Sequence, residues 1–285
     1  MKEESRPTWA DPLVYFPPLL WALNVVASRV AMQEIPPEGG AFLRSTLALP
    51  FFLLFLRRLP RMVPIGLMFF LALSGVSLFN LVLFTGVRLA PASDAAAVAA
   101  VYPLATAFAY SLYFRRPLSP NLLAGLLVSG LGVVVLALGH AGASGDKGRL
   151  LGDILLVLAA LLWGVYSVGV TLAVRERSAL EVTAGSMLLG ALLLLPVALA
   201  QPFPEAGPRA WLALLYTAVG GAFLAFTLWG LALQRHPASR VAPFMNLTPA
   251  LALLFAGLFL GEAPGLRDLP GLLLIALGVA WSQRR

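Results

Sequence analysis

Ten long apolar stretches constrain the fold of this chain more than any other feature of its sequence. A helix needs about 20 predominantly apolar residues to cross the hydrocarbon core of a bilayer. Short connections rich in Pro, Gly and Arg separate the stretches. The sequence therefore predicts an all-α integral membrane protein with ten transmembrane helices, near residues 12–32, 39–56, 64–87, 92–113, 121–139, 151–173, 180–200, 210–233, 238–260 and 266–282.

The composition supports lipid as the main solvent of the chain. Of its 285 residues, 60% are hydrophobic and 12% are charged, which is about half of the roughly 25% usual in soluble domains. The absence of cysteine excludes disulfides and thiol catalysis, and two histidines, His140 and His236, do not favour a metal site. We therefore expect no cofactor.

The net charge of +7 does not indicate nucleic-acid binding, because the basic residues stand between the apolar stretches rather than in one domain. With the N-terminus inside the cell, the tails and inner connections carry 13 Lys and Arg, and the outer connections carry 5. Cytoplasmic loops of membrane proteins carry an excess of these residues. We therefore expect a multi-pass protein of the cytoplasmic (inner) membrane with both termini in the cytoplasm.

The chain contains one five-helix unit twice. A shift of 142 residues superimposes Leu20-Trp21 on Leu162-Trp163, and a shift of 146 superimposes Pro103 on Pro249. The second shift also superimposes Pro91-Ala92-Ser93 on Pro237-Ala238-Ser239, Gly125-Leu126-Leu127 on Gly271-Leu272-Leu273, and Leu131-Gly132-Val133 on Leu277-Gly278-Val279. Because five is odd, the second unit must enter the membrane from the opposite side, as in the inverted repeats of secondary transporters. We expect a first repeat at 1–139, a connecting loop at 140–150 and a second repeat at 151–285.

In their order and spacing these motifs resemble the drug/metabolite transporter (DMT) superfamily, in particular its EamA-type ten-helix exporters. The resemblance covers nearly the whole chain and includes Leu20-Trp21-Ala22-Leu23-Asn24 and Leu162-Trp163-Gly164. It implies a secondary transporter that exports a small organic metabolite, above all an amino acid or a related compound, by alternating access. A carrier of another solute on the same fold, such as a drug, a nucleotide-sugar or a lipid, and a passive channel are the alternatives.

An enzyme is not expected. The sequence has no Gly-x-Ser-x-Gly or His-Glu-x-x-His motif for an intramembrane protease, and no Walker motif for direct use of ATP. The expected partners are a small-molecule substrate and membrane lipid, without nucleic acid, and the expected assembly is a monomer or a homodimer. Small residues on the fifth and tenth helices fit a close contact inside the molecule or between protomers: Gly125, Ser129, Gly132, Gly271 and Gly278.

Polar side chains within the apolar stretches are the candidates for a substrate site, because such groups usually face the bundle interior or a cavity. The first and sixth helices carry matching faces, formed by Trp21, Asn24 and Ser28 and by Trp163, Tyr166 and Ser167. Aromatic walls suit a partly apolar solute through stacking or cation–π contact. The alternative is that the tryptophans only pack at helix contacts, whereas a buried Asn24 needs hydrogen-bond partners and is favoured for the cavity.

The fourth helix has a polar stripe along one face, formed by Tyr102, Thr106, Tyr110 and Tyr113. Pro103 removes a backbone donor and is expected to leave the carbonyl of Ala99 without its usual partner. The stripe lines a cavity or forms part of an interfacial belt of tyrosines, and the belt is preferred for Tyr113.

Four further candidates are Ser77 and Asn80 on the third helix, Asn246 before Pro249, and Arg44 on the second helix. Asn246 bonds backbone groups loosened by the proline or points to the solute. Arg44 either extends to the interface, towards Glu34 or Glu38, or has a sharper role, in which it attracts a substrate carboxylate or gates the outer mouth. No acid stands at mid-membrane depth in the sequence, so a buried carboxylate proton relay is not visible and the coupling of transport stays open.

Overall fold

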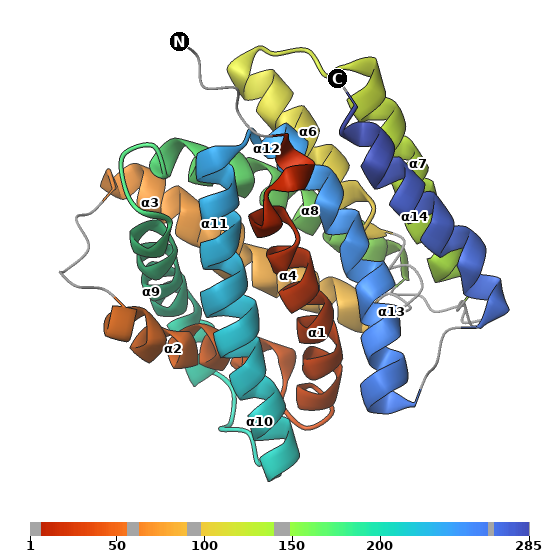
Figure 1. Ribbon diagram of the computed structural model, residues 1–285. Coiled ribbons are helices and arrows are strands. Elements are labelled where there is room, and N and C mark those ends of the chain that lie inside the picture. The colour runs from red at the N-terminus through yellow and green to blue at the C-terminus, as the bar shows by residue number, and fades with distance from the viewer. Residues whose placement is uncertain (1–6, 56–62, 90–97, 140–148, 262–264, 285) are drawn as a thin grey trace.

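A computed structural model describes residues 7–55, 63–89, 98–139, 149–261 and 265–284. These residues form ten helical rods, and the two ends of the chain lie at the same end of the bundle (Figure 1). The predicted motif at 91–93 and the loop at 140–148 lie outside the described residues.

The rods follow the predicted stretches closely. The first five are α1 (Phe16–Ala31), α2 (Pro37–Phe55), the continuous run of α3 (Ile65–Ala72), η3 (Leu73–Ser77) and α4 (Leu78–Leu89), then α6 (Val101–Phe114) and α7 (Pro120–Gly139). The second five are α8 (Arg149–Ala173), α9 (Ala179–Leu199), the run of α10 (Pro208–Tyr216), η4 (Thr217–Leu224) and α11 (Ala225–Arg235), the run of α12 (Ala238–Val241), η5 (Ala242–Asn246) and α13 (Leu247–Leu260), and α14 (Leu269–Ser282). Short 3₁₀ turns η1 (Thr8–Ala10), η2 (Pro12–Val14) and η6 (Leu266–Asp268) precede α1 and α14.

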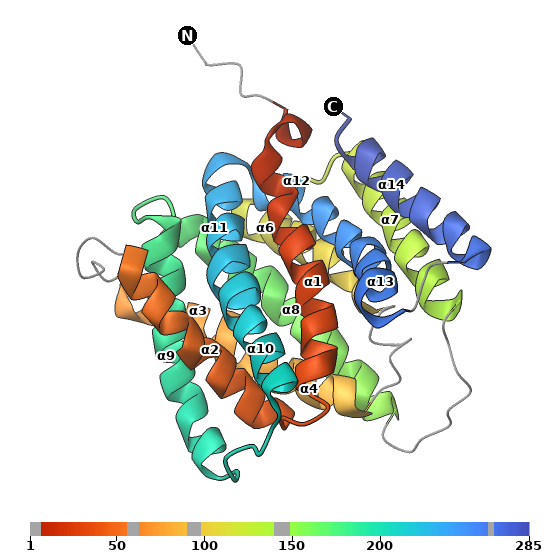
Figure 2. The same cartoon turned by 60° about the horizontal axis from the view of Figure 1, so that its bottom comes forward.

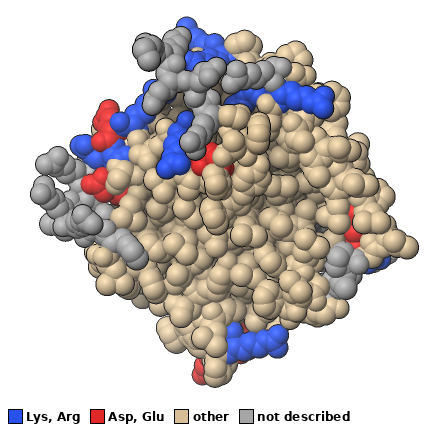
Figure 3. Space-filling view, viewed as in Figure 1, with Lys and Arg blue, Asp and Glu red and all other residues tan. Residues whose placement is uncertain are grey.

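The surface of the bundle is that of a membrane protein. Six helical stretches of the described residues are long and apolar enough to cross a bilayer. On the face shown in Figure 3, charged side chains lie at the periphery, near the ends of the rods, and uncharged residues cover the wide area between them. The predicted fold class, an all-α integral membrane protein built from two repeats, is confirmed.

The two halves share their irregularities as well as their helices. The π-helical segments η3 and η4 interrupt corresponding rods, and Pro103 and Pro249 each stand at the third position of a helix, α6 and α13. Pro103 has no N–H to offer the carbonyl of Ala99, as expected, but that carbonyl is not free, because it accepts a hydrogen bond from the N–H of Tyr102 at 3.3 Å. A proline in the first turn disturbs no helical bond, since the N–H groups there have no partner within the helix.

Helices α7 and α14 lie side by side in both views of the bundle (Figures 1 and 2). A Cβ atom added to Gly278 would lie 2.7 Å from the carbonyl oxygen of Gly125, and one added to Gly132 would lie 2.7 Å from the carbonyl oxygen of Gly271. Glycine on both helices therefore lets the two backbones touch. The small-residue faces predicted from the sequence meet inside the molecule.

Candidate substrate site at the centre of the bundle

An aromatic cluster occupies the place where the two halves meet. The ring of Trp163, on α8, lies 5.1 Å from Trp21 on α1 and 5.5 Å from Phe226 on α11, both in edge-to-face contact. Tyr166 and Phe79 lie 5.3 Å and 5.5 Å from the same ring. Such pairs add about 0.5–1.5 kcal/mol each beyond area burial. Rings from both halves thus form one rigid layer around Trp163.

The indole N–H groups of Trp21 and Trp163 each have a specific acceptor. Trp21 Nε1 donates to the carbonyl oxygen of Gly221, in η4, at 3.2 Å, and Trp163 Nε1 donates to the sulfur of Met245, in η5, at 3.3 Å. Each tryptophan is therefore fixed by an irregular segment of the second half. This fixes the ring orientations within the layer.

The two repeats make the same contact at the centre with different side chains. Asn24 and Tyr166 correspond by the shift of 142, and Gly221 and Gly75 correspond by the shift of 146. A Cβ on Gly221 would collide with the amide of Asn24, and a Cβ on Gly75 would collide with the ring of Tyr166. The first helix of each half thus packs one side chain against a glycine in the π-helical segment of the other half. Polar Asn24 in one contact and aromatic Tyr166 in the other make the centre asymmetric.

Asn24 is one of several described residues with a buried polar atom that lacks a hydrogen-bond partner. Its Oδ1 is buried and has no partner among the described residues. A buried acceptor without a donor costs about 1–3 kcal/mol. In this conformation the acceptor lies against Gly221 and stays unpaired.

Arg44 points into the bundle. Only 9% of the residue is exposed, its Nε donates to the carbonyl oxygen of Thr217 at 3.2 Å, and its Nη1 donates to Oδ1 of Asn80 at 3.2 Å. The interpretation that Arg44 extends to the interface towards Glu34 or Glu38 is wrong, because the π-helical segment η4 offers a closer carbonyl. Glu34 instead accepts a hydrogen bond from the backbone N–H of Gly207 at 2.7 Å.

A small pocket lies beside Arg44, at the end of α1 that is opposite to the chain termini. Its polar wall consists of Ser28, Arg44 and Thr217, and its apolar wall includes Met32, Ile35, Phe84 and Leu214. The guanidinium of Arg44 also lies 5.9 Å from the ring of Phe226. Arg44 therefore stands between the pocket and the aromatic layer.

Of the remaining predicted residues, Tyr102 joins the aromatic layer, whereas Ser77, Tyr110 and Asn246 make other contacts. Tyr102 meets Phe79 edge to face at 6.3 Å and so extends the aromatic layer, and the hydroxyl of Ser77 donates to the carbonyl of Ala72 in its own helix. The ring of Tyr110 lies tilted against Phe114, with centroids 4.5 Å apart, and among the described residues makes no ring contact with the central layer. Asn246 is buried and its Nδ2 donates to the hydroxyl of Ser129 at 2.7 Å, so it joins η5 to α7 rather than to backbone loosened by Pro249.

Sequence reasoning missed Phe226, Trp229 and Thr217. The rings of Trp229 and Phe226 lie 5.9 Å and 5.5 Å from Trp163. The backbone carbonyl of Thr217 accepts the hydrogen bond of Arg44. The repeat itself holds the signal for Phe226, because the shift of 146 superimposes Asn80 on it. Nothing in the sequence singles out Thr217, since its backbone carbonyl makes the contact.

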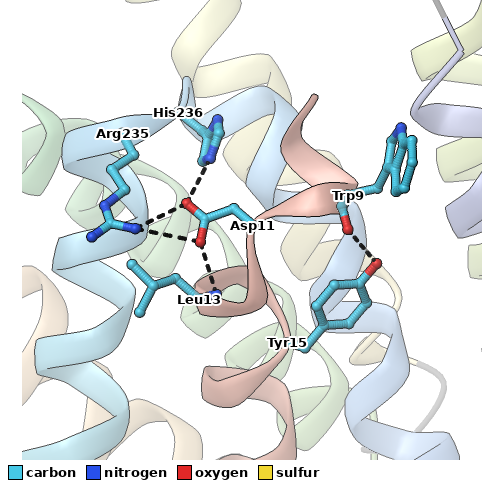
Figure 4. Close-up of polar contacts among 6 residues, drawn as sticks. All are labelled: Trp9, Asp11, Leu13, Tyr15, Arg235 and His236. Atoms are coloured by element: carbon cyan, nitrogen blue, oxygen red, sulfur yellow. Dashed lines mark hydrogen bonds and ion pairs between the residues drawn. The ribbon is translucent and has the colours of Figure 1, made fainter. Parts of the chain in front are cut away.

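A polar cluster ties the chain together at the end opposite to the pocket (Figure 4). The carboxylate of Asp11 accepts hydrogen bonds from the backbone N–H of Leu13 at 3.1 Å and from Nη1 of Arg235 at 3.4 and 3.5 Å, and it lies 3.0 Å from Nε2 of His236. Asp11 precedes α1, and Arg235 ends α11. We call Asp11, Arg235 and His236 the latch, because they join the beginning of α1 to the end of α11.

The stability of the fold depends on pH through the carboxylate of the latch. Burial alone raises the pKa of Asp11, but hydrogen bonds from Leu13, His236 and Arg235 outweigh it and hold the pKa below the ordinary 3.8. A carboxyl with a lowered pKa stabilises the fold fully above its unfolded-state pKa, and this contribution is lost as the pH falls through the folded-state pKa.

We predict that Asp11→Asn lowers the melting temperature at neutral pH by about 2–4 °C, since Arg235 is more than half exposed and contributes little. Melting curves of both proteins should differ by a constant amount above about pH 5 and converge in more acidic solution. A difference that persists unchanged into strong acid would contradict the assignment to the Asp11 carboxylate.

Comparison with known proteins places this arrangement in a class. The model of the EamA-like transporter family matches residues 8–138 and again 150–283. An uncharacterized transporter of Archaeoglobus fulgidus is 27% identical over 256 residues, which cover 86% of this chain and 87% of that protein. A crystal structure with 24% identity shares the fold at a TM-score of 0.80, over 94% of both chains. The class is that of helical membrane transporters with two repeats.

Two relatives carry names that mention a solute. A probable terminal-alkyne amino-acid exporter of Streptantibioticus cattleyicolor is 27% identical over 97% of this chain and 92% of that protein. A probable amino-acid metabolite efflux pump of Salmonella typhimurium is 27% identical over 92% of this chain and 90% of that protein. The chain belongs to the EamA-like transporter family of the DMT superfamily. It is a multi-pass membrane transporter, and its family is not one of enzymes.

Proposed function

We propose that the protein is a secondary carrier that exports an amino acid or a related small metabolite across the cytoplasmic membrane by alternating access. The observation that supports this most is the central layer around Trp163, in which both repeats contribute corresponding residues to one site. Inverted-repeat carriers bind their substrates at the interface of the repeats, near the middle of the membrane.

The chemistry of the layer supports a partly apolar organic solute. Aromatic faces offer stacking surface, and the unsatisfied Oδ1 of Asn24 offers an acceptor to an N–H donor of the solute. An amino acid combines an ammonium donor with an apolar side chain. The names of the two amino-acid exporters among the relatives support the same substrate class.

The ends of α1 differ in a way that supports alternating access. The latch ties one end of α1 to α11, whereas the pocket beside Arg44 lies at the other end. We infer that this conformation is closed on the latch side, which is the cytoplasmic side in the orientation expected from the Lys and Arg distribution. The repeats at 1–139 and 151–285 are the proposed moving units, and reversal requires the latch to open.

Flux into liposomes tests the proposal. Reconstituted protein should transport at least one radiolabelled amino acid saturably, in assays with and without a pH gradient. Asn24→Ala should lower that flux by at least about tenfold, because a hydrogen bond to a charged group is worth roughly 1.5–3 kcal/mol. Val25→Ala is the matched control, since Val25 neighbours Asn24 on α1 but is 43% exposed.

Each outcome has a distinct meaning. Saturable flux that responds to the pH gradient would show proton coupling, and saturable flux without a response would show a facilitated or differently coupled carrier. Flux that never saturates would show that the protein is a channel rather than a carrier. Absence of flux for every amino acid would overturn the substrate class and direct the search to the drugs, nucleotide-sugars and lipids carried on this fold.

A further inference from the structure

Arg44 is a buried cation whose charge is not neutralised by the protein around it. Its two hydrogen bonds go to neutral acceptors, the carbonyl of Thr217 and the amide of Asn80. In the described part of the chain no carboxylate lies within ion-pair distance of the guanidinium. Burying a charge without a partner is costly, and in membrane-spanning segments such residues mark ligand or ion pathways.

The geometry around Arg44 leaves donors available. A guanidinium carries five N–H groups in a fixed plane, and Asn80 and Thr217 occupy one each. Nη2 makes no hydrogen bond to a described residue, and Arg44 forms part of the pocket wall. Asn80 is itself held, because its Nδ2 donates to the carbonyl of Val76. The protein therefore uses Nε and one N–H of Nη1 and leaves the N–H groups of Nη2 for a ligand.

The wall of the pocket defines the polarity of that ligand. Ser28 adds a hydroxyl beside Arg44, and the rest of the wall is mainly apolar. On η4 the partner of Arg44 is Thr217 and the glycine that faces Asn24 is Gly221, about one helical turn further on. A donor for an anion and an acceptor for an N–H group thus lie about one turn apart beside the aromatic layer.

We propose that Arg44 binds the carboxylate of the ligand, so that the site selects organic carboxylates over their neutral amides. The inference deepens the proposed function and rests on it for the place of the site in the transport cycle. A planar carboxylate accepts two parallel hydrogen bonds from a guanidinium, which an uncharged carboxamide does not. Binding of the anion also removes the cost of the isolated charge.

Benzoate and benzamide are suitable probes, because they have the same shape and differ in charge. We expect benzoate to raise the melting temperature of the purified protein saturably, with benzamide at least about tenfold weaker. Arg44→Gln should abolish the difference between the two probes. Arg44→Lys should keep a weaker preference for benzoate, because lysine retains the charge but not the planar pair of donors.

Arg209→Gln is the matched control, since Arg209 is an exposed arginine near the beginning of α10. It should leave the benzoate effect unchanged. Equal effects of benzoate and benzamide on the wild type would overturn the proposal, as would a benzoate effect that survives in Arg44→Gln. If Arg44 determines benzoate binding but liposomes show no solute flux, the anion site stands and the carrier proposal fails. If amino-acid flux persists in Arg44→Gln and still favours the carboxylate form of the solute over its amide, the carrier proposal stands and the carboxylate site at Arg44 fails.

Discussion

Gly278→Ala is expected to prevent stable folding of the bundle. An added methyl group at this position would lie 2.7 Å from both the carbonyl oxygen of Gly125 and the Cα of Ser129, which are backbone atoms of α7. No side-chain rotation relieves such an overlap, so the two helices must separate. Overpacking costs about 1–3 kcal/mol where side chains can adjust, and we expect at least about 3 kcal/mol here.

Separation of α7 and α14 would have further consequences. Ser129, which packs against Gly278, also receives the hydrogen bond of Asn246 from η5. Movement of α7 would therefore break a second connection between the halves. We expect a low yield of monodisperse protein in detergent and a melting temperature well below that of the wild type.

Gly66→Ala is the control for Gly278→Ala. Gly66 lies in α3, and nothing lies within 4 Å of the position that its Cβ would take. The same substitution should stabilise this helix by up to about 1 kcal/mol, because alanine loses less backbone entropy than glycine. If both variants melt at the same temperature, the close contact of α7 and α14 does not hold the bundle together.

The sequence was sufficient to predict the helices and their repetition. Long apolar runs report directly on membrane-spanning helices, and the shift of 146 identified the glycines of α7 and α14 as corresponding residues. It could not decide where those glycines meet, because a small face fits an internal contact or a dimer equally well. The structure was needed to show that they meet each other.

Several side chains of the candidate site could be predicted from the sequence, but their contacts with backbone groups could not. Trp21, Asn24, Trp163 and Tyr166 were found because repeated aromatic and polar groups inside apolar runs are rare. The environment of Arg44 was not predictable, because its acceptor is the backbone carbonyl of Thr217, 173 residues away in sequence. The residue type does not show where a backbone carbonyl will lie, so the sequence leaves Arg44 between the interface and a substrate carboxylate.

Trp163→Ala is expected to abolish transport while some folded protein remains. The indole contacts rings from α1, the α3–η3–α4 run, α8 itself and α11, so its removal leaves a large cavity in the layer where the repeats meet. Truncating a buried tryptophan costs about 3–5 kcal/mol of stability. Flux must therefore be measured per folded molecule, after size-exclusion chromatography of the reconstituted sample.

Comparison with two further variants separates packing from function. Trp163→Phe keeps an aromatic ring but loses the N–H contact to Met245, and we expect it to fold well and to transport at a reduced rate. Trp281→Ala removes an indole of the same size from α14, where its Nε1 donates to Oδ1 of Asn121 at 3.4 Å, and should leave flux per folded molecule unchanged. Loss of flux in Trp281→Ala equal to that in Trp163→Ala would mean that removal of any indole stops the carrier. Loss confined to Trp163 would show that the aromatic layer contacts the solute or couples the motion of the repeats, because position 163 is where both repeats meet.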